Sequence, residues 1–392
     1  MNNFVFHNQC KIFFGKDTLA NVIPEIEKFG KNLLMVADDN IKKLPVYLDA
    51  QKLLLENGFT LNYIDGVHSN PRLDKIYEGI AFCKQNQVDF ILAIGGGSVI
   101  DTAKTIAFGS RTDRDVWDYF KTEQTPDRLP ITDAIPLGVI STMAASGSEM
   151  NATAVVTNAE TKEKLYVFRR DPILPRFSVM DPQYTYTIPP KYTAYGAFDI
   201  FCHLFEQYCT PTENVQLQSR FCEAVMKTVF ESALIVKEDP CNYAARANLM
   251  WSACVTLMGI TDPGMVADST GHAIEHEISA WFDIAHGAGL SILFPNWMEY
   301  AARRKPERFS NFAVNVWNVD PRGKTAEEVA MEGIRLVREF VKQIGAPSTF
   351  REVGIENTHF DEIAQAAVRF GNLGSYCIID QQDVRNILEM SY

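Results

Sequence analysis

The stretch Ile91–Lys104 reads ILAIGGGSVIDTAK, an apolar run followed by three glycines and a helical pattern. This pattern is typical of a buried strand that turns directly into a helix, with Gly95, Gly96 and Gly97 at the junction. Glycines let the backbone come close to a ligand, and the N–H groups that begin the helix at Ser98 attract an anion such as a pyrophosphate. The stretch therefore predicts either a phosphate-binding loop or a tight strand-to-helix turn without a ligand.

The glycine loop follows neither of two common phosphate-binding motifs. The dinucleotide fingerprint G-x-G-x-x-G requires glycine where Ile100 stands, and the P-loop requires a G-K-[ST] that does not follow. A second loop of small residues, Ser141–Asn151 (STMAASGSEMN), comes after another apolar run. Because ligands of open α/β sheets bind outside the carboxyl ends of the strands, we expect both loops to face one crevice that holds a cofactor.

The segments around the glycine loop alternate between strand and helix patterns. Buried strands are expected at the apolar runs 32–37, 60–64, 89–94 and 136–140, and a hairpin at 151–157 and 164–168. The stretches between the first three runs have helical periodicity and length. This alternation indicates an α/β domain with a mostly parallel sheet and helices on its faces.

Only helical patterns follow Pro189. Helices are expected at residues 195–208, 215–237, 243–259, 271–281, 287–302, 324–344 and 360–370. Pro182, Pro189 and Pro190 interrupt the chain just before these helices. We therefore expect an α/β cofactor-binding domain over residues 1–185 and an all-α domain over residues 186–392.

Composition excludes several classes of protein. A chain of 392 residues with 46% hydrophobic and 22% charged residues is expected to form two globular domains. Its net charge of −12 disfavours nucleic acid as a partner, and no apolar segment approaches the ~20 residues that span a bilayer. The N-terminus lacks the layout of a signal peptide, and the eight cysteines form no C-x-x-C pair, so a cytoplasmic location is expected.

A carboxylate follows the first predicted strand. Asp38, at the end of the run 32–37, is placed to accept hydrogen bonds from a ribose and to repel a 2′-phosphate. This interpretation favours NAD over NADP. An aspartate between a strand and a helix is also an ordinary helix cap, so the sequence leaves both roles open.

The helical half of the chain contains two pairs of polar residues at helical spacing. Asp199 and His203 lie four residues apart in the apolar stretch GAFDIFCHLFEQY, and His272 and His276 repeat that spacing in GHAIEHEISAWFDIAHGAGL, which also contains His286. Asp199, His203, His272 and His286 offer a divalent cation one carboxylate and three imidazoles. This set suits iron(II), zinc or another first-row metal, and ligand type alone does not choose among them.

The histidines have two other interpretations, as core residues and as part of a zinc protease motif. A single histidine on an apolar helix is more often a core residue than a ligand, but two spaced pairs and a third histidine favour a metal site. The HExxH motif of zinc proteases is absent, because Ala280 stands where its second histidine would be.

In order and spacing, several motifs resemble those of the iron-dependent (group III) alcohol dehydrogenases, most closely the butanol dehydrogenase-like branch. They span nearly the whole chain and are FVFHNQCKIFFG, Asn70–Pro71, GGGSVIDTAK, SGSEMN, MDPQYTYTIPP, GAFDIFCHLFEQY and HAIEHEISAWFDIAHGAG. The resemblance implies a dehydroquinate synthase-like fold, with a nicotinamide cofactor and a metal in the cleft between the two domains. It also implies a homodimer, for which the apolar N-terminal run could supply an edge strand.

The resemblance assigns roles to individual residues. It implies metal ligands at Asp199, His203, His272 and His286, and an additional active-site histidine at His276. Cofactor contacts are implied for the following positions: Gly95, Gly96, Gly97, Ser98, Asp101, Thr142, Ser146, Asn151 and Lys164. The metal is expected to be Fe²⁺, with Zn²⁺ or Mn²⁺ as alternatives. ADDN replaces the G-G-G-S that many members of the branch carry after the first strand, and this departure favours NAD(H) over NADP(H).

The expected function is hydride transfer between NAD(P)(H) and a small alcohol or aldehyde, and the protein is expected to act as an aldehyde reductase. The metal is expected to act as a Lewis acid and His276 to relay a proton. The alternative is an NAD- and metal-dependent lyase like dehydroquinate synthase, which must hold a phosphorylated substrate with Lys and Arg. A less polar substrate is indicated by the aromatic residues on the helices that carry the predicted metal ligands, which are Phe198, Phe201, Phe205, Trp281 and Phe282. A non-catalytic nucleotide-binding protein is disfavoured because all four ligand positions are occupied.

Overall fold

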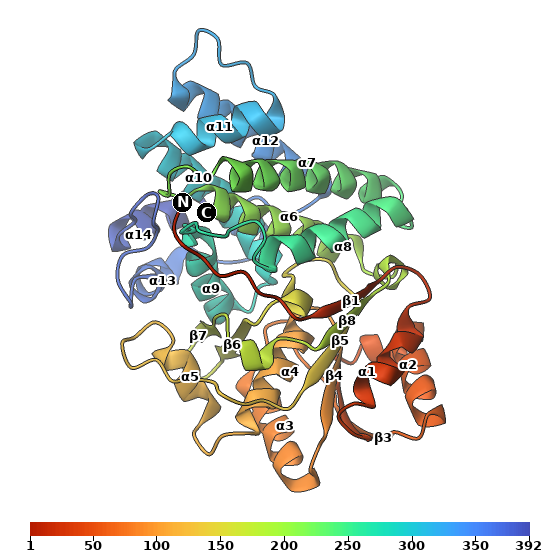
Figure 1. The fold of residues 1–392 in the computed structure, drawn as a ribbon. Coiled ribbons are helices and arrows are strands. Elements are labelled where there is room, and N and C mark those ends of the chain that lie inside the picture. Colours follow the sequence, from red (N-terminus) through yellow and green to blue (C-terminus); the bar gives the residue numbers. More distant parts are fainter. The chain divides into compact units, whose positions relative to one another are not determined.

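The structure is a computed structural model that describes all 392 residues (Figure 1). By its internal contacts the chain divides into a sheet unit, His7–Ile188, and a helical unit, Pro189–Tyr392, which also contains Met1–Phe6. The first residues are held in the helical unit by backbone hydrogen bonds, from the Met1 ammonium to the Glu213 carbonyl (2.5 Å) and from the Asn2 N–H to the Gly264 carbonyl (2.9 Å). The chain therefore begins in the helical unit, builds the sheet unit and returns at Pro189.

The sheet unit is built on six parallel strands in the order β1-β8-β5-β4-β2-β3. The strands of this sheet are β1 (Lys11–Phe14), β2 (Asn32–Val36), β3 (Thr60–Ile64), β4 (Phe90–Gly95), β5 (Leu137–Ser141) and β8 (Phe177–Met180). A separate antiparallel hairpin joins β6 (Ala154–Asn158) to β7 (Glu163–Val167). The fold class expected from the sequence is confirmed.

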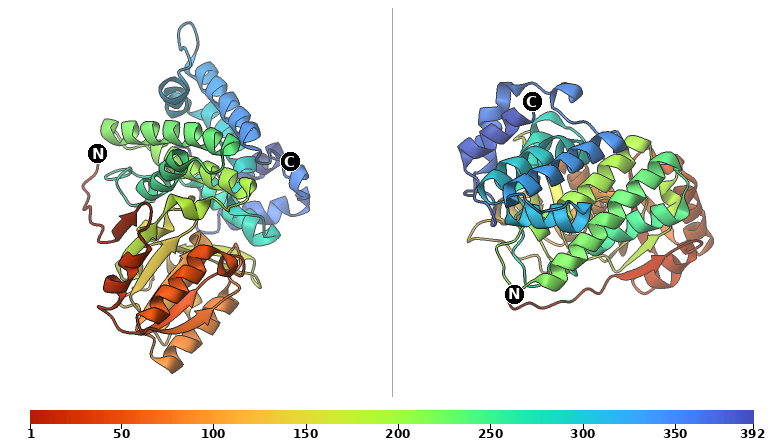
Figure 2. Two further views of the ribbon diagram at one scale, coloured as in Figure 1. Left: turned by 90° about the vertical axis from the view of Figure 1, so that its right-hand side faces the viewer. Right: turned by 90° about the horizontal axis from the view of Figure 1, so that it is seen from above.

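Both faces of the sheet are covered because successive side chains of a strand point to opposite faces. Leu34 and Ile91 belong to one core, together with apolar residues of two helices, and Leu33 and Leu92 belong to the core on the other face. The helices of the unit are α1 (Val22–Ile26), α2 (Pro45–Glu56), α3 (Leu73–Asn86), α4 (Gly97–Gly109) and α5 (Val116–Thr122). Helices α3 and α4 pack on the first face and α1 and α2 on the second (Figure 2).

The helical unit contains nine α-helices. They are α6 (Pro190–Tyr208), α7 (Gln216–Glu238), α8 (Tyr243–Leu257), α9 (Thr270–Phe282), α10 (His286–Arg304), α11 (Glu307–Trp317), α12 (Ala326–Ile344), α13 (Phe360–Ala367) and α14 (Gln381–Met390). Helix α6 is buried over most of its length and contacts α7, α8, α9 and α10. A helix that is apolar on nearly every side lies inside a domain, so the polar groups on α6 are held in the core of this unit.

The phenylalanines of α6 correct one expectation. Phe198, Phe201 and Phe205 are fully buried, and the ring of Phe205 packs edge-on against those of Phe294 and Phe312. They form the core of the helical unit, where removing one such ring costs about 3–5 kcal/mol. These three rings are therefore not evidence about the polarity of a substrate.

The observed elements extend the predicted ones. The expected strands and helices are present within a few residues, except that α6 begins five residues before the predicted helix at 195–208 and that the helix predicted over residues 360–370 ends at Ala367. Strand β8 and helices α1, α5, α11 and α14 were not predicted. None of the helices combines the length and apolar character needed to cross a bilayer.

Candidate functional site

Helix α6 carries a carboxylate and an imidazole on one face. Asp199 and His203 are one helical turn apart, and the His203 Nε2 lies 3.3 Å from the Asp199 Oδ1. The Asp199 side chain is 5% exposed, whereas that of His203 is 20% exposed. His203 therefore lies closer than Asp199 to the surface of the helical unit.

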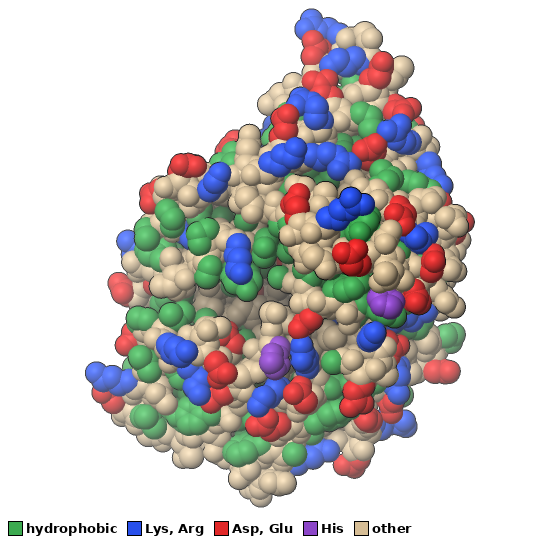
Figure 3. All heavy atoms as spheres, turned by 180° about the vertical axis from the view of Figure 1, so that it is seen from behind, with side chains coloured by type: hydrophobic (Ala, Val, Ile, Leu, Met, Phe, Trp, Pro, Cys, Tyr) green, Lys and Arg blue, Asp and Glu red, His purple; other side chains and the backbone are tan.

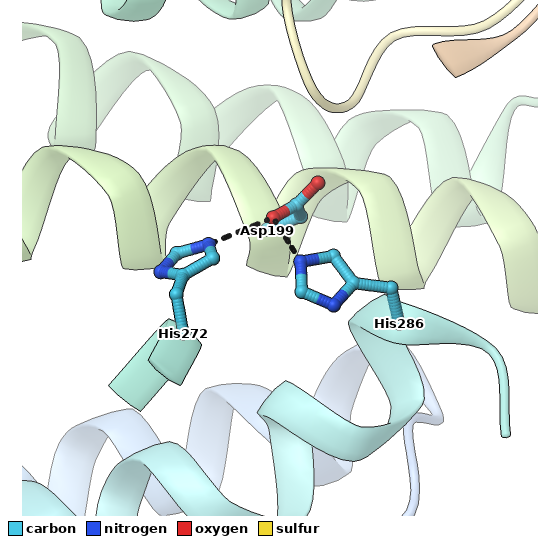
Figure 4. A group of neighbouring side chains, drawn as sticks. All are labelled: Asp199, His272 and His286. Carbon is cyan, nitrogen blue, oxygen red and sulfur yellow. Dashed lines mark hydrogen bonds and ion pairs between the residues drawn. The ribbon is translucent and has the colours of Figure 1, made fainter. Parts of the chain in front are cut away.

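Helices α9 and α10 bring two more imidazoles to the same oxygen. The Nε2 atoms of His272 and His286 lie 3.4 Å and 3.6 Å from the Asp199 Oδ1, as Figure 4 shows. His272 lies near the start of α9 and His286 is the first residue of α10. The donor atoms of Asp199, His272 and His286 lie within 4.8 Å of one another. The three predicted histidine ligands thus converge on one carboxylate oxygen of the fourth, Asp199.

Two buried glutamates, which the sequence analysis missed, hold the other side of the rings. Glu206 Oε2 accepts a hydrogen bond from the His272 Nδ1 at 2.5 Å, and Glu275 accepts one from the His286 Nδ1. Both glutamates lie three residues after a predicted ligand, in His203-Leu-Phe-Glu206 and His272-Ala-Ile-Glu275. The repeated H-x-x-E spacing on apolar helices was the available signal.

The chemistry of this donor set fits a cation. An imidazole that donates from Nδ1 presents a lone pair at Nε2 once it is neutral, so His272 and His286 in that form would both aim acceptors at the carboxylate oxygen of Asp199. Acceptors that converge on one point repel one another unless a positive charge lies between them. Imidazole and carboxylate are the ligands of catalytic zinc and of non-haem iron(II).

The protonation behaviour of the cluster agrees with this view. Burial would raise the pKa of Asp199, but the neighbouring His203, His272 and His286 hold it well below its usual range. Burial opposes the charged form of His272, yet Glu206 and Asp199 outweigh it and raise its pKa to about 10. Burial and the adjacent His272 ring lower the pKa of His203 to about 3. The cluster therefore attracts one positive charge to its centre.

His276 lies beside the cluster. It follows His272 by one turn of α9, and its ring centroid lies 5.5 Å from that of His286. Its donor atoms lie within 4.8 Å of those of Glu275 and His286, and the residue is partly exposed.

In the sheet unit, the two predicted cofactor loops lie next to each other. Gly95 of β4 pairs with Ser141 of β5, so the loops leave the carboxyl ends of adjacent strands. A methyl group added to Gly97 would overlap the Ser146 Oγ, and one added to Gly96 would press on Met143. No side chain caps the N-terminus of α4, which leaves its first N–H groups for an anion.

Asp101 and Lys104, one turn inside α4, face the second loop. Asp101 is buried, and its oxygens accept hydrogen bonds from the Ser148 Oγ (2.6 Å) and the Val155 N–H (3.0 Å). The fully buried Lys104 Nζ donates to the Ser148 carbonyl at 2.7 Å and to the Asn151 Oδ1 at 3.0 Å. The pair therefore fastens the second loop to α4, and the carboxylate of Asp101 is engaged within the unit.

The remaining predicted cofactor residues are also held in place. The Thr142 N–H donates to the Gly95 carbonyl (3.1 Å), and the Ser98 hydroxyl donates to the Ser69 carbonyl (2.6 Å). Lys164 is buried, and its Nζ donates to the Asn70 Oδ1 at 3.2 Å.

Asp38 caps a turn at the end of β2. Its Oδ1 accepts from the N–H groups of Asn40 (2.7 Å) and Ile41 (3.1 Å), so Asp38 holds the turn that leads into the short helix Ile41–Lys43, whose own cap residue is Asn40. Only one carboxylate oxygen takes part in this cap.

Comparison with known proteins agrees with these features. Residues 10–182 match the model of iron-containing alcohol dehydrogenases, and residues 193–392 match that of the C-terminal domain of the same family. The chain is 40% identical, over the full length of both chains, to a probable NADH-dependent butanol dehydrogenase 2 of Bacillus subtilis. It is 32% identical, over 91% of both chains, to the NADPH-dependent aldehyde reductase YqhD of Escherichia coli.

A solved structure has the same fold. The NADH-dependent butanol dehydrogenase A of Thermotoga maritima superposes with a TM-score of 0.93 at 35% identity, covering 100% of this chain and 99% of the other.

Proposed function

This chain belongs to the iron-containing alcohol dehydrogenase family, a metal- and nicotinamide-dependent class of alcohol and aldehyde oxidoreductases, and on that premise we propose that it reduces small aldehydes with NADH. The convergence of three imidazole nitrogens on the Asp199 Oδ1 is the observation that carries the proposal. The family match gives no support to the lyase alternative.

The residues of the helical unit are suited to hold a divalent metal, for which we propose Fe²⁺ with Zn²⁺ or Mn²⁺ as alternatives. Asp199 would contribute the charged ligand and His203, His272 and His286 the neutral ones. When bound, such a metal supplies Lewis-acid polarisation of a carbonyl, and the reduced nicotinamide supplies the hydride. The buried position of Asp199 keeps water away from the ligand cluster on the side of the core.

His276 is the proposed proton donor for the alcohol product. It lies within 4.8 Å of the donor atoms of Glu275 and His286, and it is partly exposed, so it can exchange protons with solvent. Alanine at this position is expected to flatten the pH–rate profile while the metal stays bound. A His276→Ala protein with an unchanged profile would limit this residue to a supporting role.

In the sheet unit, Gly95, Gly96, Gly97 and Ser98 are proposed to bind the pyrophosphate of NADH through the start of α4. Thr142, Ser146 and Lys164 are the proposed contacts to the rest of the coenzyme. Asp101 and Asn151, whose polar groups are engaged by the loop and by Lys104, are proposed to act on the coenzyme by holding the second loop in place.

The preference for NADH over NADPH rests on Asp38. Its carboxylate follows β2, at the carboxyl edge of the sheet where a ribose is bound in folds of this type. A negative side chain at this point disfavours a 2′-phosphate. The B. subtilis relative is named for NADH and the E. coli relative for NADPH, so a direct comparison of the two coenzymes is required.

The decisive experiment is a spectrophotometric screen. The protein is reconstituted with Fe²⁺, Zn²⁺ or Mn²⁺, and oxidation of NADH and NADPH is followed with a panel of aldehydes that includes butanal. Faster oxidation of NADH in the presence of an aldehyde is expected. No oxidation with any metal would refute the proposed reaction, and equal rates with both coenzymes would refute the role of Asp38.

We also propose a homodimer in the cytoplasm. Strand β1 is at the edge of the sheet, and the preceding Phe4, Val5 and Phe6 are exposed, which favours pairing with a second copy. All eight cysteines are thiols, as expected in a reducing compartment. Light scattering after size-exclusion chromatography tests the dimer. Acidic and basic side chains are intermingled over the face shown in Figure 3, which offers no continuous basic surface to nucleic acid.

A further inference from the structure

The sequence H-x-x-E occurs three times in the helical unit, and the two occurrences that begin with a proposed metal ligand lie on α6 and α9. Each glutamate binds the histidine of a different helix. Glu206 of α6 binds His272 of α9, and Glu275 of α9 binds His286 of α10. The three helices that carry the proposed metal ligands are therefore linked in series by two carboxylate–imidazole hydrogen bonds.

Glu206 fixes both the ring and the backbone of His272. Its Oε2 accepts from the His272 Nδ1 at 2.5 Å, and its Oε1 accepts from the His272 backbone N–H at 3.0 Å. The side chain is 5% exposed, so water cannot easily replace either contact. This arrangement sets the rotation of the imidazole and leaves its Nε2 facing Asp199 at 3.4 Å.

Glu275, which is fully buried, fixes the ring of His286. It accepts from the His286 Nδ1 and from the Ser279 hydroxyl, one turn further along α9. Space for its carboxylate is provided by Gly289 of α10, where an added methyl group would lie 2.5 Å from the Glu275 Oε1. The close approach of α9 and α10 therefore depends on a glycine opposite the glutamate.

We propose that Glu206 and Glu275 are positioning residues that set the affinity of the metal site, by holding His272 and His286 in the tautomer that presents Nε2 and by making those nitrogens stronger donors. The inference rests on the metal site of the proposed function. Hydrogen bonds of this kind orient metal-binding imidazoles, and their removal typically lowers metal affinity about 10- to 100-fold.

A purely structural role would not require this chemistry. A buried carboxylate is costly to desolvate, and a buried polar pair is often no more stabilising than apolar residues of the same volume. Glu277 provides the contrast within α9. It is also buried, but it forms an ion pair with Arg369, and at two residues from Glu275 it lies on a different face of the helix.

The test is a titration of the full-length protein with Zn²⁺ and Co²⁺ against a competing chelator, without coenzyme or aldehyde. Glu206→Gln and Glu275→Gln keep the size of the side chain but remove its charge. Each is expected to lower metal affinity about 10- to 100-fold and to shift the visible absorption of bound Co²⁺. Glu277→Gln is the matched control, and its metal affinity is expected to stay within about threefold of wild type.

Two further variants separate the proposal from simple unfolding. Ser279→Ala removes a hydroxyl that donates to Glu275 and to the Ile284 carbonyl, and it is expected to lower metal affinity less than Glu275→Gln does. Glu206→Asp keeps the charge and is expected to recover part of the affinity lost in Glu206→Gln. Metal affinities equal to that of Glu277→Gln in every folded variant would overturn the inference. If the wild-type protein itself binds no divalent metal, the proposed function fails first, so the two failures are distinguishable.

Discussion

The proposed metal site of the helical unit and the glycine loop of the sheet unit are built in different ways. In the metal site, side chains from three helices direct their donor atoms at one oxygen of Asp199. In the glycine loop, the proposed ligand-binding surface is backbone, and the charged pair Asp101 and Lys104 supports it from behind. A site made of donor atoms is destroyed by removing an atom, whereas a site made of backbone is destroyed by adding one. The two should therefore fail independently.

The largest expected effect is that of Asp199→Asn. It removes the only charged ligand, so metal binding and aldehyde reduction should both be lost, the latter by about a thousandfold, since metal polarisation of a carbonyl is worth several kcal/mol. Binding of NADH, followed by its fluorescence, should be unchanged because the coenzyme loops belong to the sheet unit. Treatment of the wild-type protein with a chelator should reproduce both results. Loss of NADH binding in either case would contradict the independence of the two sites.

The next effect in size is that of Lys104→Met. The variant leaves four oxygen acceptors of Lys104 without their donor and removes a positive charge near the buried Asp101, so the free energy of unfolding should fall by about 3 kcal/mol and NADH should bind more weakly. Urea denaturation and NADH fluorescence measure the two changes. Adding Asp101→Asn should restore part of the stability. Metal affinity should not change, and a large change in it would show that the two units are coupled.

The pH dependence of stability provides a second test of Lys104. Burial lowers the pKa of Lys104 to about 8, although Asp101 opposes the shift, whereas an unfolded lysine keeps about 10.5. Between these pH values the unfolded chain binds a proton that the folded chain has released, so the unfolding free energy contributed by this residue rises with pH. The stability advantage of wild type over Lys104→Met should therefore grow from pH 8 to pH 10. A constant difference would contradict the shifted pKa.

A smaller effect is expected for Gly97→Ala, which adds one methyl group between the two coenzyme loops. Because that methyl overlaps the Ser146 Oγ, the loops must separate, at a cost of about 1–3 kcal/mol. The dissociation constant of NADH should rise about 5- to 100-fold while metal affinity is unchanged. The double variant Gly97→Ala/Ser146→Gly removes the clash and should recover NADH binding. Failure of this rescue would indicate that the glycine serves the ligand directly.

The smallest effect is expected for Asp38→Gly. Removing a partly exposed carboxylate should relieve about 1 kcal/mol of repulsion toward a 2′-phosphate, so the NADPH/NADH ratio of kcat/KM should rise about fivefold. Steady-state kinetics with both coenzymes measure the ratio, with one aldehyde held at constant concentration. Asp39→Gly is a suitable control because Asp39 is adjacent and does not cap the turn. An equal change in both variants would assign the preference to net charge rather than to Asp38.

The two regions also differ in how well they could be predicted from the sequence, because one is built from side-chain donors and the other from backbone. Two pairs of residues at the proposed metal site, Asp199 with His203 and His272 with His276, lie at helical spacing on apolar helices and could be recognised from periodicity. For Glu206 and Glu275 the repeated H-x-x-E spacing was the one available signal, because a glutamate in a helix is usually solvent-exposed and only the packing of α6, α9 and α10 buries these two. Periodicity places a residue on a face but does not identify its partner on another helix.

The elements missed by the sequence analysis are short or weakly patterned. Strand β8 has four residues and follows Pro175, so it offers little alternation. Helix α14 (QQDVRNILEM) has few apolar residues, and Val384, Ile387 and Leu388 become a recognisable stripe only when the neighbouring helices are known. The loop residues could be predicted because they follow recognisable strands. The role of Lys104 could not, because a lysine is rarely fully buried and is expected at the surface.

The placement of the first six residues in the helical unit has a consequence for synthesis. Met1–Phe6 are synthesised more than two hundred residues before their hydrogen-bond partners, Glu213 and Gly264. At the usual 5–20 residues per second this delay is on the order of 10–40 seconds. The sheet unit can fold during that time, with the exposed Phe4 and Val5 still attached to it and without a partner. Met1–Phe6 are thus synthesised before the sheet unit but form their hydrogen bonds only after the helical unit has been made.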